Sequence, residues 1–222
     1  MQDNSNKYFA FISYSHKDIE WAKWLSGKLE KYTVPRNVLP ETLKNELLVS
    51  KKRLFPVFRD QDELPTSADL SNAIVEALRT SNCLLVICSP NATQSQWVNE
   101  EIRQYKAMGR TSRILAVLVS GEPNTDGEKE CFPPALRYEV TADGKITDQR
   151  VEPLAADLRA ATAPKDKKAH DTLDKEFLRI AAGVWGVGFD TLFQREYRRR
   201  MRQLKQRVFI TAVSIIALLR NL

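Results

Sequence analysis

The sequence places one carboxylate between two aromatic side chains on the same face of a predicted helix. Trp97, Glu101 and Tyr105 are spaced four residues apart, which aligns side chains along one face of an α-helix. A carboxylate in an aromatic-lined cleft can stabilise a developing oxocarbenium ion, as it does in sites that cleave glycosidic bonds. The alternative is a solvated glutamate near a helix N-terminus, where the helix dipole favours negative charge. Spacing alone leaves both interpretations open, and the solvated glutamate is the commoner of the two.

This helix follows an apolar run, residues 83–88, that is typical of a strand buried on both faces. Ser89 and Pro90 end the strand, because proline has no amide hydrogen to give to a sheet. A polar loop then leads to a helix that begins near Ser95 or Trp97. We expect this helix to turn three apolar side chains inward, those of Val98, Ile102 and Met108. A buried strand that leads into a helix in this way places the connecting loop at the carboxyl edge of a parallel sheet, where open α/β sheets bind ligands.

Polar residues also follow the first two predicted strands. The strand-end residues are Ser13, Tyr14, Ser15 and His16 after the first strand, Arg59, Asp60 and Asp62 after the second, and Ser89, Trp97 and Glu101 after the third. Residues from different strands converge only at a common sheet edge, so these form the candidate site. We expect His16 to face solvent, and the loop that contains it also offers side chains that can cap the next helix.

Common cofactor and catalytic motifs are absent. The chain has neither GxGxxG nor a GxxxxGK phosphate loop, which argues against a Rossmann dinucleotide site or a P-loop. It has no HExxH or paired-histidine spacing, so no metal site is predicted, and no GxSxG nucleophile elbow. A receiver domain would place an aspartate at the end of the third strand, where Cys88 and Ser89 stand instead.

The elements that must position these residues alternate along the chain. Strands are predicted within 8–14, 54–58, 83–88 and 114–119, and the helices between them include 19–32 and a segment that starts near 70. This alternation predicts right-handed crossovers and a parallel sheet. Pro56 indicates an edge strand or a bulge. Further along, Asp143-Gly144 predicts a β-hairpin over residues 138–147. A fifth short strand is predicted within residues 151–158, and an amphipathic helix over residues 173–184.

The net charge of +6 comes from one segment of this 222-residue chain. Residues 195–207 hold seven Arg or Lys against one acid, which leaves 27 basic and 27 acidic residues elsewhere. The main body is therefore not predicted to bind nucleic acid. Three cysteines form neither a disulfide framework nor a CxxC metal spacing, and the polar N-terminus has no signal-peptide pattern. These features predict a cytoplasmic location.

Residues 208–219 carry no charge and directly follow the basic segment. Twelve helical residues extend about 18 Å, which is short of the roughly 30 Å hydrocarbon core of a bilayer. Three interpretations stay open: the start of a membrane helix, an interfacial or helix-pairing tail, and a helix packed on the body. The first two predict contact with the inner face of a membrane through 195–219.

Three blocks of sequence resemble the Toll/interleukin receptor (TIR) domain family of the bacterial type. The first block is Phe11 to Asp18, FISYSHKD; the second is Phe55 to Pro65, FPVFRDQDELP; the third runs from Ser89-Pro90 to Ser95-Gln96-Trp97-Val98-Asn99-Glu100-Glu101-Ile102. The resemblance covers about residues 8–121, with a looser continuation to about 190. It implies a flavodoxin-like α/β fold in which helices flank a central parallel sheet.

The resemblance also implies an activity, because many such domains cleave NAD+ at the bond between nicotinamide and ribose. It assigns catalysis to Glu101, four residues after the tryptophan, with Glu100 as the second choice. The implied substrate-binding residues are Ser13, Tyr14, Asp60, Trp97 and Ser89. The implied interface with other TIR domains is the BB loop, which comprises Gln61, Asp62, Glu63, Leu64 and Pro65. NAD+ would be a substrate rather than a cofactor, and the family's usual cysteine after the tryptophan is Val98 here.

Two functional classes follow from this resemblance. One is an NAD+ glycohydrolase, with cyclase activity as a variant, in signalling or in an antiphage or cell-death response. The other is a non-catalytic scaffold that signals by pairing with other TIR domains. The predicted organisation is a polar tail over 1–7, a TIR domain over 8–190 and a basic helix running into an apolar segment over 191–222.

Overall fold

The structure is a computed structural model, and it describes residues 7–34, 56–59, 70–125, 127–164, 166–199, 201, 202 and 206. Asp60, the BB loop residues Gln61, Asp62, Glu63, Leu64 and Pro65, and the apolar tail over 208–219 lie outside this range. The roles predicted for them therefore stay predictions.

Within the described residues, a five-stranded parallel sheet forms the centre of the molecule. Its strands are β1 (Tyr8–Ser13), β2 (Val57–Arg59), β3 (Ser81–Cys88), β4 (Ile114–Leu118) and β7 (Ala155–Asp157), in the spatial order β2-β1-β3-β4-β7. All four neighbouring pairs are parallel. When these five strands are renumbered in chain order, their spatial order is 2-1-3-4-5, which is the order of flavodoxin-like folds. This strand order confirms the predicted fold class.

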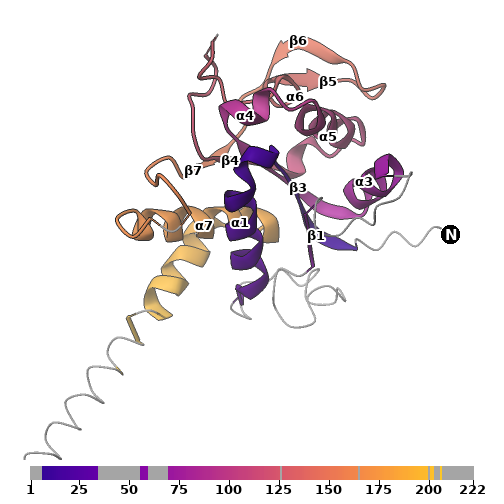
Figure 1. Cartoon of the computed structure of the whole chain (residues 1–222). Helices are drawn as coiled ribbons and strands as arrows, with labels where there is room; N and C mark the ends of the chain where they lie inside the picture. The colour runs from indigo at the N-terminus through magenta and orange to yellow at the C-terminus, as the bar shows by residue number, and fades with distance from the viewer. Residues whose placement is uncertain are drawn as a thin grey trace, which may run out of the picture.

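Helices cover both faces of the sheet (Figure 1). The helices of the described residues before residue 189 are η1 (His16–Asp18), α1 (Ile19–Lys31), α3 (Leu70–Arg79), α4 (Pro90–Thr93), α5 (Gln96–Ala107), η3 (Thr111–Arg113), α6 (Pro134–Arg137) and α7 (His170–Trp185). The apolar residues of α1 and α7 belong to one buried cluster, and those of α3, α4, α5 and α6 belong to a second. The sheet thus separates two cores, as in a doubly wound fold.

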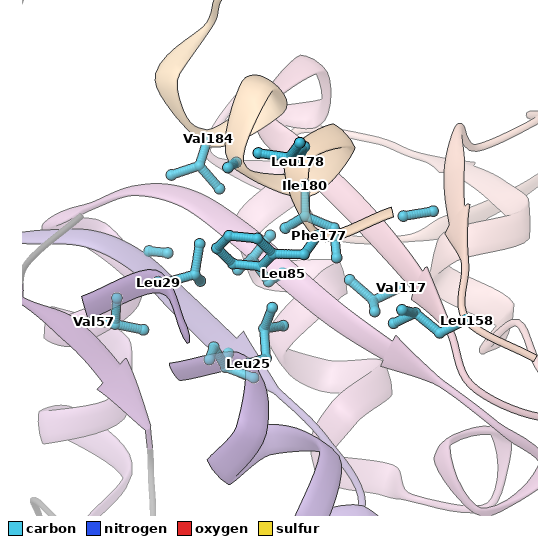
Figure 2. Packing of buried hydrophobic residues seen from close by; sticks show 14 of the residues in the cluster. Leu25, Leu29, Val57, Leu85, Val117, Leu158, Phe177, Leu178, Ile180 and Val184 are labelled. Atoms are coloured by element: carbon cyan, nitrogen blue, oxygen red, sulfur yellow. The ribbon is translucent and has the colours of Figure 1, made fainter. Parts of the chain in front are cut away.

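Strand β3 shows why the predicted apolar run is continuous. Cys83, Leu85 and Ile87 face the α1/α7 core, whereas the alternate residues Leu84, Val86 and Cys88 face the other core. Period-two alternation between two buried faces requires apolar residues at every position. Figure 2 shows the α1/α7 core, where Leu85 and Val117 of the sheet lie close to Phe177, Ile180 and other side chains of the covering helices.

Two sequence predictions about turns and edges are confirmed. Strand β2 is an edge strand, as Pro56 indicates, and the carbonyl of Pro56 still accepts a hydrogen bond from the Phe9 amide at 2.9 Å. The predicted hairpin consists of β5 (Tyr138–Val140) and β6 (Ile146–Arg150), which pair antiparallel. Gly144 supplies the positive φ of +80° in its turn, and Arg103 of α5 donates to the Gly144 carbonyl at 2.7 Å.

Two other expectations are wrong in detail. The link after β3 is not only a polar loop, because residues 90–93 form the short helix α4, which Ser89 caps by accepting from the Asn91 and Ala92 amides. Met108 does not face inward: it is 36% exposed, because α5 ends at Ala107 and Met108 lies past its last turn. Helix α5 begins where the sequence predicts, and Ser95 caps it by accepting from the Val98 amide.

The C-terminal part of the described chain is helical. Helix α7 ends at Gly186, whose φ of +64° gives a left-handed cap. A further helical segment begins at residue 189, buries Leu192 in the α1/α7 core and then extends away from the body (Figure 1). Among the described residues, none of the helices combines the length and the apolar character needed to cross a membrane.

Lys106 of α5 is a buried cation beside the hairpin. It is 4% exposed, and its Nζ donates to the Tyr138 carbonyl at 2.8 Å and, more weakly, to the Leu136 carbonyl at 3.5 Å. Burial lowers the pKa of Lys106 from 10.5 to about 8, because the low-dielectric surroundings disfavour the ammonium form.

We expect this shift to make stability depend on pH. Between about 8 and 10.5 the unfolded chain holds the proton that folded Lys106 has released, so the free energy of unfolding rises with pH in this window. The full rise is at most about 3 kcal/mol. Urea unfolding of the wild type and Lys106→Met at pH values below and above this window measures it. Parallel pH curves for the two proteins would contradict this assignment, and Lys129→Met, at an exposed position, is the matched control.

Candidate active site at the carboxyl ends of β1 and β3

The candidate site lies where the two central strands end. β1 and β3 are neighbours in the sheet, and Ser13, the last residue of β1, is in register with Val86 of β3. The chain leaves β1 towards α1 on one face of the sheet and leaves β3 towards α4 and α5 on the other face. This divergence is the topological switch point of the fold, and open α/β sheets bind ligands in the crevice beside it.

Glu101 faces the end of β1. Its Oε2 accepts a hydrogen bond from the Ser13 hydroxyl at 2.5 Å, and both residues are buried, with Glu101 only 4% exposed. The interpretation as a solvated glutamate is therefore wrong for this residue. A short hydrogen bond from a hydroxyl to a buried carboxylate holds the acid in one orientation. The structure thus brings together two of the residues that the sequence assigned to the site.

Glu100, the second choice for the acid, faces away from this edge. Its carboxylate accepts hydrogen bonds from Arg103, at 2.5 and 2.7 Å, and from Gln104 at 2.8 Å, and its side chain is 38% exposed. The Arg103 guanidinium holds the pKa of Glu100 below its usual value. Glu100 is therefore committed to an ion pair on the helix surface, and Glu101 is the better candidate of the two.

The aromatic neighbours of Glu101 have different surroundings. Trp97, one turn earlier, is 60% exposed, whereas Tyr105, one turn later, is fully buried and its hydroxyl donates to the Ser81 carbonyl at 3.3 Å. Burial raises the pKa of Tyr105 to about 12. The row of three therefore runs from solvent into the core, and Glu101 is the one that bonds to the carboxyl end of β1. Tyr14, next to Ser13, is buried, whereas His16 is exposed as expected.

Ser89 is also at this edge, but its hydroxyl is fully engaged within the protein. It donates to the Asp18 carboxylate at 2.5 Å and accepts from the amides of Asn91 and Ala92 at 3.1 Å each. Asp18 accepts a second hydrogen bond, from the Asn91 side chain at 3.1 Å. In the sequence, Asp18 belongs to a loop that could cap a helix and to the first block of the TIR resemblance. No local pattern links it to Ser89, 71 residues away.

The described residues also line a cavity that lies elsewhere. It measures about 480 Å³ and is lined by residues of α1, α7 and the C-terminal segment, among them Trp24, Lys28 and Phe177. These side chains belong to or flank the core on the face opposite α5, so this cavity is not part of the candidate site. Within the described ranges, no cluster of His, Cys, Asp or Glu side chains could hold a metal ion.

The strand order and the buried acid at the switch point define a flavodoxin-like α/β domain with a candidate ligand site at its β1–β3 edge. Residues 10–154 match the model of the TIR domain, so the chain belongs to the TIR domain family. Over 96% of its length the chain is 30% identical to the NAD(+) hydrolase ApTIR of an Actinoplanes species. The matched part makes up 28% of that relative, so the chain corresponds to about a quarter of the relative's length.

Proposed function

We propose that this TIR domain cleaves NAD+ at the bond between nicotinamide and ribose, with Glu101 as the catalytic residue. The observation that carries the proposal is the buried Glu101 carboxylate, held by Ser13 at the β1–β3 switch point. Membership of the TIR family and similarity to a relative named as an NAD(+) hydrolase support it. The carboxylate of the neighbouring Glu100 is instead paired with Arg103 on the helix surface.

The chemistry requires negative charge beside the ribose. When the C1′–N bond breaks, both electrons leave with nicotinamide, which becomes neutral, and positive charge develops on the ribosyl ring. A fixed carboxylate stabilises this charge more in the transition state than in the ground state, where the charge is on the pyridinium ring. Water then adds to C1′ and releases a proton, so the products are nicotinamide, ADP-ribose and H+. Attack by a group of the substrate itself in place of water would give a cyclic product.

We propose that further residues contact the substrate. Tyr14 continues the chain from Ser13, and the exposed indole of Trp97 offers a stacking surface one helical turn from Glu101. Asp60 belongs to the proposed site through the family resemblance. Ser89 uses its donor and acceptor groups internally, so we propose that it acts by shaping the first turn of α4 rather than by binding substrate.

The test is an NAD+ consumption assay on the purified protein over a range of protein concentrations, with chromatographic identification of the products. We expect NAD+ loss with stoichiometric nicotinamide, and a specific activity that rises with concentration because we propose that the domain self-associates through residues 61–65. Intact NAD+ at the highest protein concentration would leave the non-catalytic scaffold as the function. The second product separates hydrolysis from cyclisation. We infer a role in signalling or in an antiphage response from the same family resemblance.

We also propose that the basic C-terminal segment contacts an anionic membrane surface. In the described part of this segment, Arg198, Arg199 and Arg202 are exposed, and clustered arginines attract anionic lipid head groups. The expected result is that the protein co-sediments with vesicles containing phosphatidylserine and is released by high salt. A version that ends at Glu196 is the control. Equal sedimentation of the two versions would contradict the proposal.

A further inference from the structure

Asp18 occupies the N-cap position of α1 but does not cap that helix. An aspartate at this position ordinarily accepts a hydrogen bond from a backbone amide of the first turn. Here the Asp18 side chain makes no cap hydrogen bond and instead accepts from Ser89 Oγ at 2.5 Å and from Asn91 Nδ2 at 3.1 Å. The Asp18 side chain thus joins two segments that are distant in the sequence.

Ser89 extends this contact into the backbone of α4. Its Oγ accepts from the amides of Asn91 and Ala92, which are the first amides of that helix because Pro90 has none. Asp18 and Ser89 are both buried, and in such surroundings hydrogen bonds to a carboxylate are strong and directional. Among the described residues, Asp18 forms no ion pair, so these hydrogen-bond donors are what stabilise its charge.

The same two segments are joined a second time at the candidate site. One segment runs from Ser13 to Asp18 after β1, and the other from Ser89 to Glu101 after β3. The Ser13–Glu101 hydrogen bond joins them at one point, and the Asp18 contacts with Ser89 and Asn91 join them at another. Helix α4 packs against α5, which carries Glu101. The second link adds to the packing of α5 on the sheet in holding Glu101 against the end of β1.

We propose that Asp18 is a positioning residue for NAD+ cleavage: by fixing α4 against the β1–α1 loop, it sets the placement of Glu101 relative to Ser13 and the substrate ribose. This inference rests on the function proposed above. Asp18 need not touch substrate, so its effect falls on the rate of the bound complex. A misplacement of about 1 Å at a reacting group can lower the rate about 100-fold.

The test compares steady-state kinetics of the wild type, Asp18→Ala, Asp18→Asn and Glu20→Ala. We expect Asp18→Ala to lower kcat by about 10- to 100-fold with KM changed by less than about threefold. Asp18→Asn should restore most of kcat, because its carbonyl can accept from Ser89 while its amide donates to Asn91 after rotation of the Asn91 side chain. Glu20, exposed in the first turn of α1, is the matched control, and its removal should change neither parameter.

A second measurement does not depend on activity. Hydrogen exchange at the Asn91 and Ala92 amides should be faster in Asp18→Ala than in the wild type and close to the wild-type rate in Asp18→Asn. If Asp18→Ala does not fold, Asn91→Ala replaces it, because that variant removes only one of the two hydrogen bonds and should also lower kcat.

Three outcomes would overturn an assignment, and they are distinguishable. If the wild type is active and folded Asp18→Ala has an unchanged kcat, the positioning role alone is overturned. The same holds for an unchanged kcat in Asn91→Ala where that variant replaces Asp18→Ala. Loss of kcat in Glu20→Ala to the same extent as in Asp18→Ala also overturns it, since any change near α1 would then suffice. A wild type that leaves NAD+ intact overturns the proposed function and the catalytic part of this inference. In that case, amide exchange still decides whether Asp18 holds α4.

Discussion

Glu101→Gln abolishes NAD+ cleavage under the proposed mechanism, whereas Glu100→Gln leaves it largely intact. Glutamine has nearly the same shape as glutamate, and its carbonyl can still accept the hydrogen bond from Ser13, which spans 2.5 Å in the wild type. What the substitution removes is the negative charge that stabilises the ribosyl cation. Loss of one fixed electrostatic group at a reacting centre lowers kcat by about 10²–10³-fold, and a full charge is expected to have at least this effect.

The Glu100→Gln variant tests whether the loss of activity is specific to Glu101. Glu100→Gln removes a charge of the same kind from the adjacent position, but there the carboxylate is paired with Arg103 on the surface. Surface ion pairs contribute at most about 1 kcal/mol to stability, so this variant should fold and retain activity. Nicotinamide release by both variants and the wild type, at equal concentrations and with matched circular dichroism spectra, measures the difference. Equal loss of activity in both variants would mean that the site depends on α5 as a whole rather than on Glu101.

Phe177→Ala is expected to lower the free energy of unfolding by about 3–5 kcal/mol, the usual range for removing a buried phenylalanine. Phe177 projects from α7 into the core between α7, α1 and the sheet (Figure 2). Its ring packs edge-on against Tyr32, at 5.4 Å between centroids, and Trp24, at 6.4 Å, and Lys28 lies 5.2 Å from the ring centroid. Alanine would enlarge the cavity that Phe177 and these three side chains already line.

The control for this prediction keeps most of the volume. Phe177→Leu should cost less than half as much as Phe177→Ala, because an aliphatic side chain still fills the space and only the aromatic contacts are lost. Chemical denaturation monitored by circular dichroism gives both values. A loss below about 1 kcal/mol for Phe177→Ala would show that α7 contributes little to the stability of the domain.

Local signals in the sequence determined the elements of this fold. The apolar run over 83–88 specifies a strand buried on both faces, because only a central strand of a parallel sheet has no solvent-facing side. Pro56 restricted the second strand to an edge or a bulge, since a missing amide hydrogen is tolerated there, and β2 lies at the edge. Asp143-Gly144 specifies the hairpin and Gly186 the end of α7, because both turns need a backbone conformation that glycine adopts without strain. Each of these signals acts within a few residues, so no tertiary contact is needed to interpret it.

The geometry of the candidate site was decided by the tertiary structure. Successive helical residues point in directions about 100° apart, so the sequence shows that Glu100 and Glu101 differ in direction but not which of them meets the end of β1. The packing of α5 against the sheet buries Glu101 beside Ser13, pairs Glu100 with Arg103 and leaves Trp97 exposed. The contact between Asp18 and Ser89 joins residues 71 positions apart, and no periodicity reports a pairing between two loops. Such contacts depend on where the strands end in space, which only the assembled sheet determines.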